Sequence, residues 1–247
     1  QLSLAGWALV LLLYRFPTSF GLFFLLVLLE SALRSPSLPI ADGLIARMAV
    51  RHRLNFGSMR LWESFGFAAV SILSGIAWRQ IGYRTMFFAA AAAVLPALLA
   101  ARRLEEGEQA LGNGRQSIRV LGQDKGMVIL YTTAFLLGIA IFSTFTFSGV
   151  FMTQLGGSEF HIGLLFGLSA LAEVPIMRSS GAIVHRLQGP RALLLAQALL
   201  LAALLGHALA WSPTALIVAG VVKGVGYGLL FVVRVHRLHA RGPADWN

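Results

Sequence analysis

Long apolar runs separated by short polar connections make up most of this sequence. A helix needs about 20 predominantly apolar residues to cross the hydrocarbon core of a bilayer. β-Strands are not expected, because the runs are too long and do not alternate between apolar and polar residues. We therefore predict an all-α polytopic membrane protein. Its eight expected spans lie at roughly 2–14, 18–46, 57–78, 85–101, 126–151, 160–180, 191–210 and 213–233.

The composition agrees with a chain that lies largely in lipid. Charged residues make up 12% of the sequence and hydrophobic residues 57%, whereas soluble domains carry about 25% charged residues. There is no cysteine, which excludes disulfides and thiolate metal sites. Gln1 begins inside an apolar run with no charged segment before it, so we interpret the start as cut rather than as a signal peptide.

The positive charges are distributed unevenly between the two sides of the expected spans. The connections after spans one, three, five and seven contain 3 Lys or Arg residues. Those after spans two, four, six and eight contain 14, together with the span ends beside them. The positive-inside rule places the 14-charge side in the cytoplasm. The net charge of +10 therefore reflects membrane orientation rather than a nucleic-acid partner, and we expect a cell-membrane protein, in a bacterial inner membrane.

One long polar segment, 102–125, divides the chain. It contains Glu105, Glu106, Glu108, Gly112 and Gly114 and has no sustained apolar period. We interpret it as a cytoplasmic linker between an N-terminal bundle part, 1–101, and a C-terminal part, 126–247.

Ionisable side chains inside spans are costly and mark candidate functional sites. Asp42 and Arg60 are each nine residues from the turn centre near Arg51, roughly 13 Å deep along two antiparallel helices. They can pair with each other or hold a polar ligand, or they can be two interfacial charges near the cytoplasmic surface. Glu63, one turn beyond Arg60, can compete with Asp42 for the guanidinium.

Two further charges lie deep in later spans. Glu173 is near the middle of its span, two residues before Pro175, and Lys223 is midway along the last span. A buried carboxyl favours its neutral form and can carry a proton, and a buried lysine needs a partner, for which Glu173 is a candidate. The alternative is that Glu173 and Lys223 form an ion pair with a structural role only.

Other residues have more ordinary interpretations. Glu30 and Arg34 have the i,i+4 spacing of a pair that neutralises itself, and His207 is expected to be interfacial. The small residues of the last span are expected to let it approach its neighbours closely. They are Ala219, Gly220, Gly224, Gly226 and Gly228.

Several segments resemble the lactose permease-like branch of the major facilitator superfamily, which includes sugar, nucleoside and phenylpropionate symporters. Pro39-Ile40-Ala41-Asp42 and the run from Asn55 to Phe67 resemble its helices 4 and 5, and Ala172-Glu173-Val174-Pro175 resembles its helix 8. A degenerate cytoplasmic loop motif follows, formed by Gly181, His185, Arg186, Gly189 and Arg191. The resemblance covers essentially the whole chain and makes the eight spans helices 3 to 10 of twelve.

The resemblance implies which residues bind the solute. Asp42 and Arg60 resemble the acid and arginine that bind sugar in the central cavity, Phe67 matches a stacking Trp, and Glu173 lies at or near the acidic site of helix 8. Lys223 completes the expected substrate site.

This sequence differs from the lactose permease-like branch at several positions, and these differences affect which residue is expected to couple transport to protons. Glu63 replaces the usual Gly, His185 replaces the loop motif's Asp, and Gln188 lengthens that motif. Gly226 and Leu229 occupy the positions of the permease's proton-linked His and Glu. Proton coupling is therefore assigned to Glu173, and lactose itself is not the expected substrate.

The function expected from these residues is secondary active transport of a small polar or anionic organic solute by alternating access, as a proton-coupled symporter. We expect a monomer in the lipid bilayer, without cofactor or metal, and not an enzyme, because no catalytic motif is present. Two alternatives stay open. One is an exporter of drugs or metabolites on the same fold, and the other is a non-transporting truncated remnant, which the flanking DNA would reveal.

Overall fold

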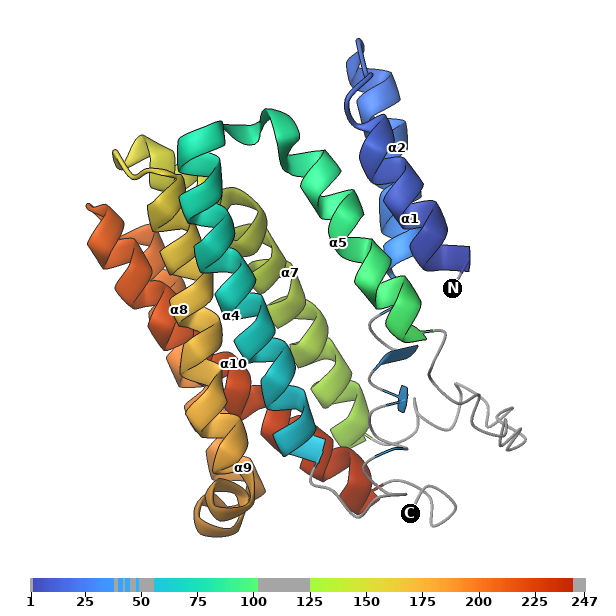
Figure 1. The fold of residues 1–247 in the computed structure, drawn as a ribbon. Helices are drawn as coiled ribbons and strands as arrows, with labels where there is room; N and C mark the ends of the chain where they lie inside the picture. Colours follow the sequence, from blue (N-terminus) through green and yellow to red (C-terminus); the bar gives the residue numbers. More distant parts are fainter. Residues whose placement is uncertain are drawn as a thin grey trace.

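The computed structural model describes residues 2–37, 40–41, 43–44, 48, 56–101 and 125–241. This part of the chain consists of helices joined by short connections and contains no strand, which confirms the all-α prediction (Figure 1). The helices are α1 (Leu2–Leu13), α2 (Phe20–Arg34), α4 (Phe56–Ile81), the 3-10 turn η1 (Tyr83–Thr85), α5 (Met86–Ala101), α7 (Lys125–Gln154), α8 (Glu159–Arg178), α9 (Ser180–Ala208) and α10 (Pro213–Arg241).

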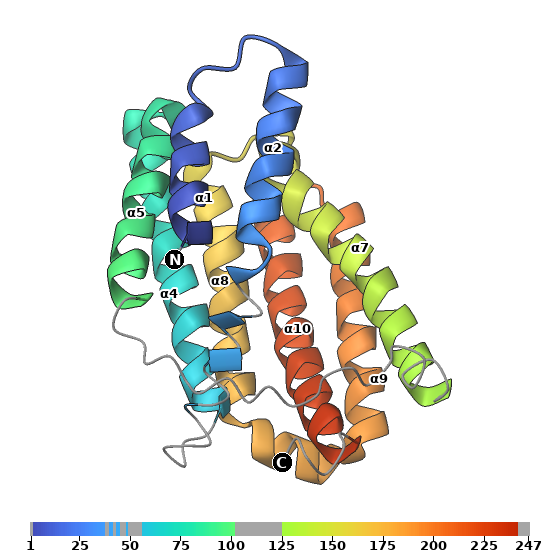
Figure 2. The same cartoon turned by 90° about the vertical axis from the view of Figure 1, so that its right-hand side faces the viewer.

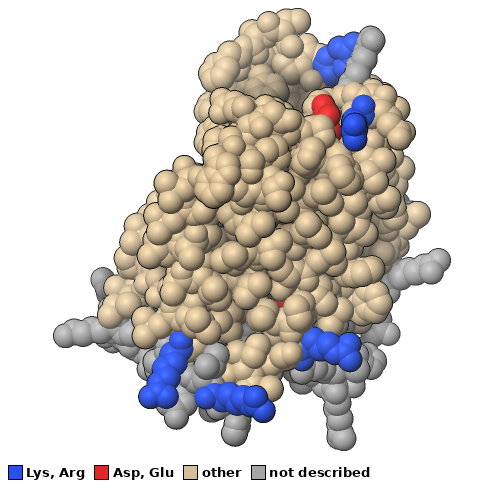
Figure 3. Space-filling model, turned by 90° about the vertical axis from the view of Figure 1, so that its left-hand side faces the viewer, with Lys and Arg blue, Asp and Glu red and all other residues tan. Residues whose placement is uncertain are grey.

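Five of the described helices are long and apolar enough to cross a membrane, and they contain the segments Leu61–Ile81, Phe135–Gln154, Glu159–Arg178, Arg191–Ala208 and Pro213–Phe231. The spans expected at 2–14, 18–46 and 85–101 correspond to the shorter helices α1, α2 and α5, of 12, 15 and 16 residues. On the face shown in Figure 3, Lys and Arg side chains lie at the two ends, with a broad zone almost free of charge between them. This distribution is that of a multi-pass membrane protein.

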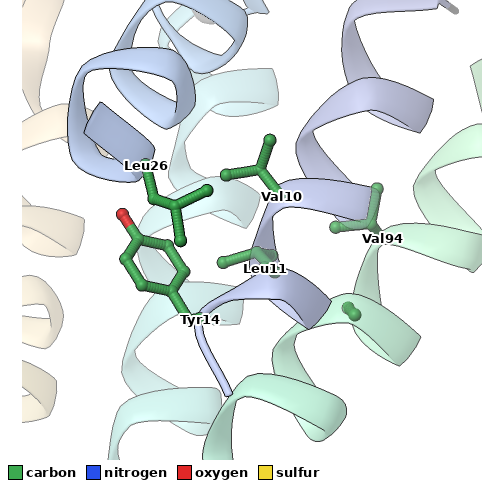
Figure 4. Close-up of a cluster of buried hydrophobic side chains, with 6 residues drawn as sticks. Val10, Leu11, Tyr14, Leu26 and Val94 are labelled. Carbon is green, nitrogen blue, oxygen red and sulfur yellow. The ribbon is translucent and has the colours of Figure 1, made fainter. Parts of the chain in front are cut away.

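The helices form two groups, which lie apart in the view of Figure 1. In one group, α1 packs against α2 and α5, and Val10, Leu11, Tyr14, Leu26 and Val94 belong to its core (Figure 4). In the other group, α8 packs against α4 and α10, and α10 packs against α9. Helix α4, which belongs to the N-terminal segment, thus packs against the helices of the C-terminal segment. The predicted linker, 102–125, lies outside the described residues except for Lys125, and the division into two bundle parts stays a prediction.

The expected pair on α2 is confirmed. Arg34 Nε lies 3.6 Å from Glu30 Oε1. The Tyr14 hydroxyl donates a hydrogen bond to Glu30 Oε2 at 2.9 Å, and the Tyr14 ring stacks on Phe87 of α5 with centroids 5.0 Å apart. The carboxylate therefore links α2 to the end of α1, which the i,i+4 spacing alone does not show.

The connections around α8 differ in kind. The turn from α7 into α8 contains Gly156 with φ +80°, a conformation that glycine adopts without a steric cost. Ser158 caps α8, and its backbone N–H donates to His161 Nδ1 at 3.1 Å. The segment 181–190, expected as a loop, is helical instead, because α9 begins at Ser180 directly after α8 ends at Arg178.

Candidate functional site

Helix α8 is the centre of the candidate site, since it lies between α4 and α10 (Figure 2). Small residues allow α4 to approach it closely. A Cβ at Gly163 would lie 2.6 Å from the Ser71 carbonyl oxygen and 3.0 Å from Gly75 Cα, and one at Gly167 would lie 2.5 Å from Ile72 Cγ1. Side chains at these positions would force the two helices apart, so backbone-to-backbone packing depends on the glycines.

The opposite side of α8 meets the small residues of α10. A Cβ at Gly220 would lie 2.5 Å from Leu165 Cδ1, and one at Gly228 would lie 3.3 Å from Glu173 Cα. A Cβ at Gly224 would collide with the Ser169 carbonyl oxygen. The expectation that the last span approaches its neighbours closely is therefore confirmed, and its main neighbour on this side is α8.

Glu173 lies where these two contacts meet. The hydroxyl of Ser64, on α4, donates to Glu173 Oε2 at 3.1 Å. Ser64 is buried, and its oxygen also lies 3.9 Å from the Met177 sulfur, one turn further along α8. The carboxylate thus receives a hydrogen bond from a helix of the N-terminal segment while its backbone contacts α10.

Lys223 provides the positive charge near this carboxylate. It is 8% exposed and lies next to Gly224, where α10 meets Ser169 of α8, one turn before Glu173. Its Nζ also lies 5.9 Å from the centroid of the Phe166 ring on α8, within the range of a cation–π contact. The structure therefore brings Glu173 and Lys223 to one junction of α4, α8 and α10, which we name the Glu173 junction.

The other predicted substrate residues are placed differently. Asp42 lies outside the described residues. Arg60 lies in the first turns of α4, and its side chain is also outside the described part. Phe67 is 46% exposed, three residues beyond Ser64. Glu63 is exposed as well.

Ser64 was not predicted from the sequence. Its only sequence signal is a small hydroxyl residue one helical turn beyond Arg60, and serines are common in membrane helices. The hydrogen bond to Glu173 becomes visible only once α4 and α8 are placed together.

His207 lies near the end of α9, and its side chain is packed inside the protein. Its interfacial position stays a prediction. The side chain is 6% exposed, and Nδ1 lies 2.9 Å from the carbonyl oxygen of Ala203. Nε2 has no hydrogen-bond partner among the described residues. Burial follows from the close contact of α9 with α10, where a Cβ at Gly206 would lie 3.0 Å from Ala219 Cβ.

The loop motif forms the first turns of α9. Arg186 and Arg191 are exposed, and the side chains of Gly181, His185 and Gly189 lie outside the described part. The described residues contain no group of three or more His, Cys, Asp or Glu residues placed to hold a metal ion.

A cavity of about 320 Å³ lies away from the Glu173 junction, near the end of α4 and the start of α8. It is lined by Ile76, Arg79, Gln80 and Phe160. Burial raises the pKa of the nearby Tyr83 phenol, and the negative charge of Glu159 raises it further. This end of the molecule thus carries both a cation and an acid.

A helical bundle with an almost uncharged middle zone is typical of a multi-pass membrane protein, and the charged side chains where its helices cross mark a candidate functional site. The chain belongs to the MFS_1 like family, whose sequence profile matches residues 1–246. Family membership and the names of its relatives indicate a transporter rather than an enzyme.

Two relatives are similar over much of the chain. A maltose permease of Geobacillus stearothermophilus is 31% identical over 219 residues, which are 88% of this chain and 56% of the permease. An uncharacterized transporter of Bacillus subtilis is 25% identical over 178 residues, 71% of this chain and 45% of that protein. The chain thus spans about half the length of these relatives. No solved structure matches it significantly.

Proposed function

We propose that the protein is a secondary active transporter that moves a small polar organic solute by alternating access, in symport with protons. The observation that carries this proposal is the Glu173 junction, where a partly buried acid and a buried cation lie between helices of the two chain segments. Transporters of this kind place solute and ion sites near the bilayer midplane, between parts that move against each other.

The junction supports a role for Glu173 in proton coupling. An ionised Glu173 accepts the Ser64 hydrogen bond and balances the charge of Lys223, whereas a protonated Glu173 loses its attraction for Lys223. Proton binding therefore changes how strongly α4, α8 and α10 hold together. A ligand that changes the relative stability of two conformations shifts the population between them.

The proposed solute site includes residues of both segments. Asp42, Arg60 and Phe67 contribute from the N-terminal side, and Glu173 and Lys223 from the C-terminal side. Their carboxylates accept hydrogen bonds from hydroxyl groups, and their cations donate to solute oxygens.

A sugar is the solute class that we favour. A polyhydroxylated solute matches this mixture of acceptors and donors, and the name of the maltose permease among the relatives supports it. An organic anion is the second candidate, because Lys223 is a buried cation.

The membrane arrangement is also proposed. The distribution of Lys and Arg supports a bacterial inner membrane, with linker 102–125 and the C-terminal end in the cytoplasm. One chain supplies all the proposed site residues, which supports a monomer.

Transport in proteoliposomes tests the proposal. Glu173→Gln should keep counterflow of a sugar at a reduced affinity, because the amide oxygen still accepts a hydrogen bond and counterflow needs no net proton movement. It should lose accumulation driven by a pH gradient. Glu159→Gln, at the first residue of the same helix, is the matched control and should accumulate solute normally.

Two results would contradict the proposal. The first is normal pH-driven accumulation by Glu173→Gln, which would remove its proton-coupling role. The second is undiminished transport by Arg60→Ala, which would exclude the solute site.

A further inference from the structure

His207, near the end of α9, has one ring nitrogen bonded and one without a partner. Nδ1 lies 2.9 Å from the Ala203 carbonyl oxygen, which can only accept a hydrogen bond. Nδ1 therefore carries the hydrogen, and Nε2 of the neutral ring presents a lone pair. That nitrogen is buried and has no hydrogen-bond partner among the described residues.

Lys223 is the donor suited to this lone pair. Helix α10 packs against α9. A Cβ at Gly206, next to His207, would lie 3.0 Å from Ala219 Cβ, and Lys223 is one helical turn beyond Ala219 on α10. The ammonium has three N–H donors and is 8% exposed. A buried ammonium is costly unless acceptors surround it.

Glu173 and His207 lie on different helices against α10. Glu173, on α8, is the acidic group whose charge acts on Lys223. His207, on α9, is the buried titratable group next to Gly206, which contacts α10 at Ala219. From α4, Ser64 contributes a hydroxyl that bonds Glu173. Lys223 is thus on the helix that packs against both the helix of Glu173 and the helix of His207.

We propose that His207 Nε2 is the alternative acceptor for the Lys223 ammonium, used when Glu173 is protonated. This inference rests on the proposed function, in which Glu173 carries the transported proton. While Glu173 is ionised, its carboxylate balances Lys223. When Glu173 is neutral, the ammonium donates to Nε2 and keeps its proton. His207 is then a positioning residue that holds Lys223 charged through both states.

A proton carried by His207 itself would fit the geometry less well. Protonation at Nε2 would create an N–H donor that is buried and without a partner, and would place a second positive charge near Lys223. Both effects oppose protonation of the ring. The neutral ring instead presents the Nε2 lone pair, which is the hydrogen-bond acceptor that a buried ammonium needs.

Thermal unfolding of the purified protein tests this contact without any transport assay. His207→Phe removes the acceptor, and we expect it to lower the Tm only slightly when Glu173 is present. In the Glu173→Gln background, Lys223 depends on His207, so the same substitution should lower the Tm by a further ~3 °C or more. His207→Gln, whose amide oxygen can accept, should restore much of this loss.

Two comparisons keep the test specific. Leu205→Phe changes an exposed residue on the same helix and should have equal effects in both backgrounds. His207→Leu removes the acceptor without adding a ring, and it should repeat the dependence on Glu173.

An equal loss of Tm for His207→Phe in both backgrounds would overturn the proposal, as would a His207→Gln variant no better than His207→Phe. Unimpaired proton-driven transport by Glu173→Gln, with the Tm dependence intact, would refute the proposed function alone. The contact between Lys223 and His207 would then have a role in stability but not in proton coupling.

Discussion

Ser64 of α4 donates a hydrogen bond to Glu173 of α8 across 109 positions of sequence, with 3.1 Å between the two oxygens. Each residue lies on a helix that meets its neighbour through glycines. The close backbone approach is what allows a side chain as short as serine to reach the carboxylate. A polar link between the two chain segments therefore depends on the small residues that surround it.

The first prediction concerns this bond. Ser64→Ala should lower the free energy of unfolding by about 1 kcal/mol, because a partly buried carboxylate would lose a donor. Thermal or denaturant unfolding in detergent measures the change. Ser74→Ala is the matched control on the same helix, because the Ser74 hydroxyl donates to the carbonyl of Ser71 within α4. Equal effects of the two substitutions would show that the bond to Glu173 contributes nothing particular.

The second prediction concerns the crossing of α4 and α8. Gly163→Leu should push the helices apart, because even a Cβ there would lie 2.6 Å from the Ser71 carbonyl oxygen. We expect a loss of several °C in Tm and weaker protection of α4 amides from hydrogen exchange. Gly138→Leu on α7 serves as the control, since no atom lies within 4 Å of a Cβ there. Unchanged exchange in Gly163→Leu would argue against the tight crossing.

The third prediction concerns the contact between α1 and α2. Tyr14→Phe removes the hydroxyl that donates to Glu30 but keeps the ring that stacks on Phe87. The expected loss of stability is ~1 kcal/mol. Arg34→Gln should cost less, because the Arg34 side chain is 56% exposed and water screens its ion pair. Unfolding followed by tryptophan fluorescence compares the two variants. A larger loss of stability in Arg34→Gln would show that the ion pair contributes more than the hydrogen bond from Tyr14.

The sequence predicted those features that depend on local spacing. Apolar runs predicted the helical class, the i,i+4 spacing predicted the pair of Glu30 and Arg34, and the glycines of the last span predicted its close packing. Each of these signals is contained within one helix.

The features that the sequence missed require two helices to be placed together. Apolar faces in lipid are chemically alike, so they do not specify that α8 lies between α4 and α10. The partnership of Ser64 with Glu173 and the burial of His207 both follow from that placement. The helical start of α9 was missed because glycines and Pro190 in this segment are typical of a loop.

The last prediction tests whether Lys223 and Glu173 act as a pair. Replacing only Lys223, by Gln, should destabilise the protein by about 1–3 kcal/mol, because the partly buried Glu173 would lose its balancing charge. Replacing both residues by Gln should cost less than the sum of the single replacements, since the double variant leaves no unbalanced charge. Unfolding of the four proteins gives the interaction energy directly. Additive costs would mean that each residue is held by other groups, and the Glu173 junction would then have no electrostatic basis for sensing protonation.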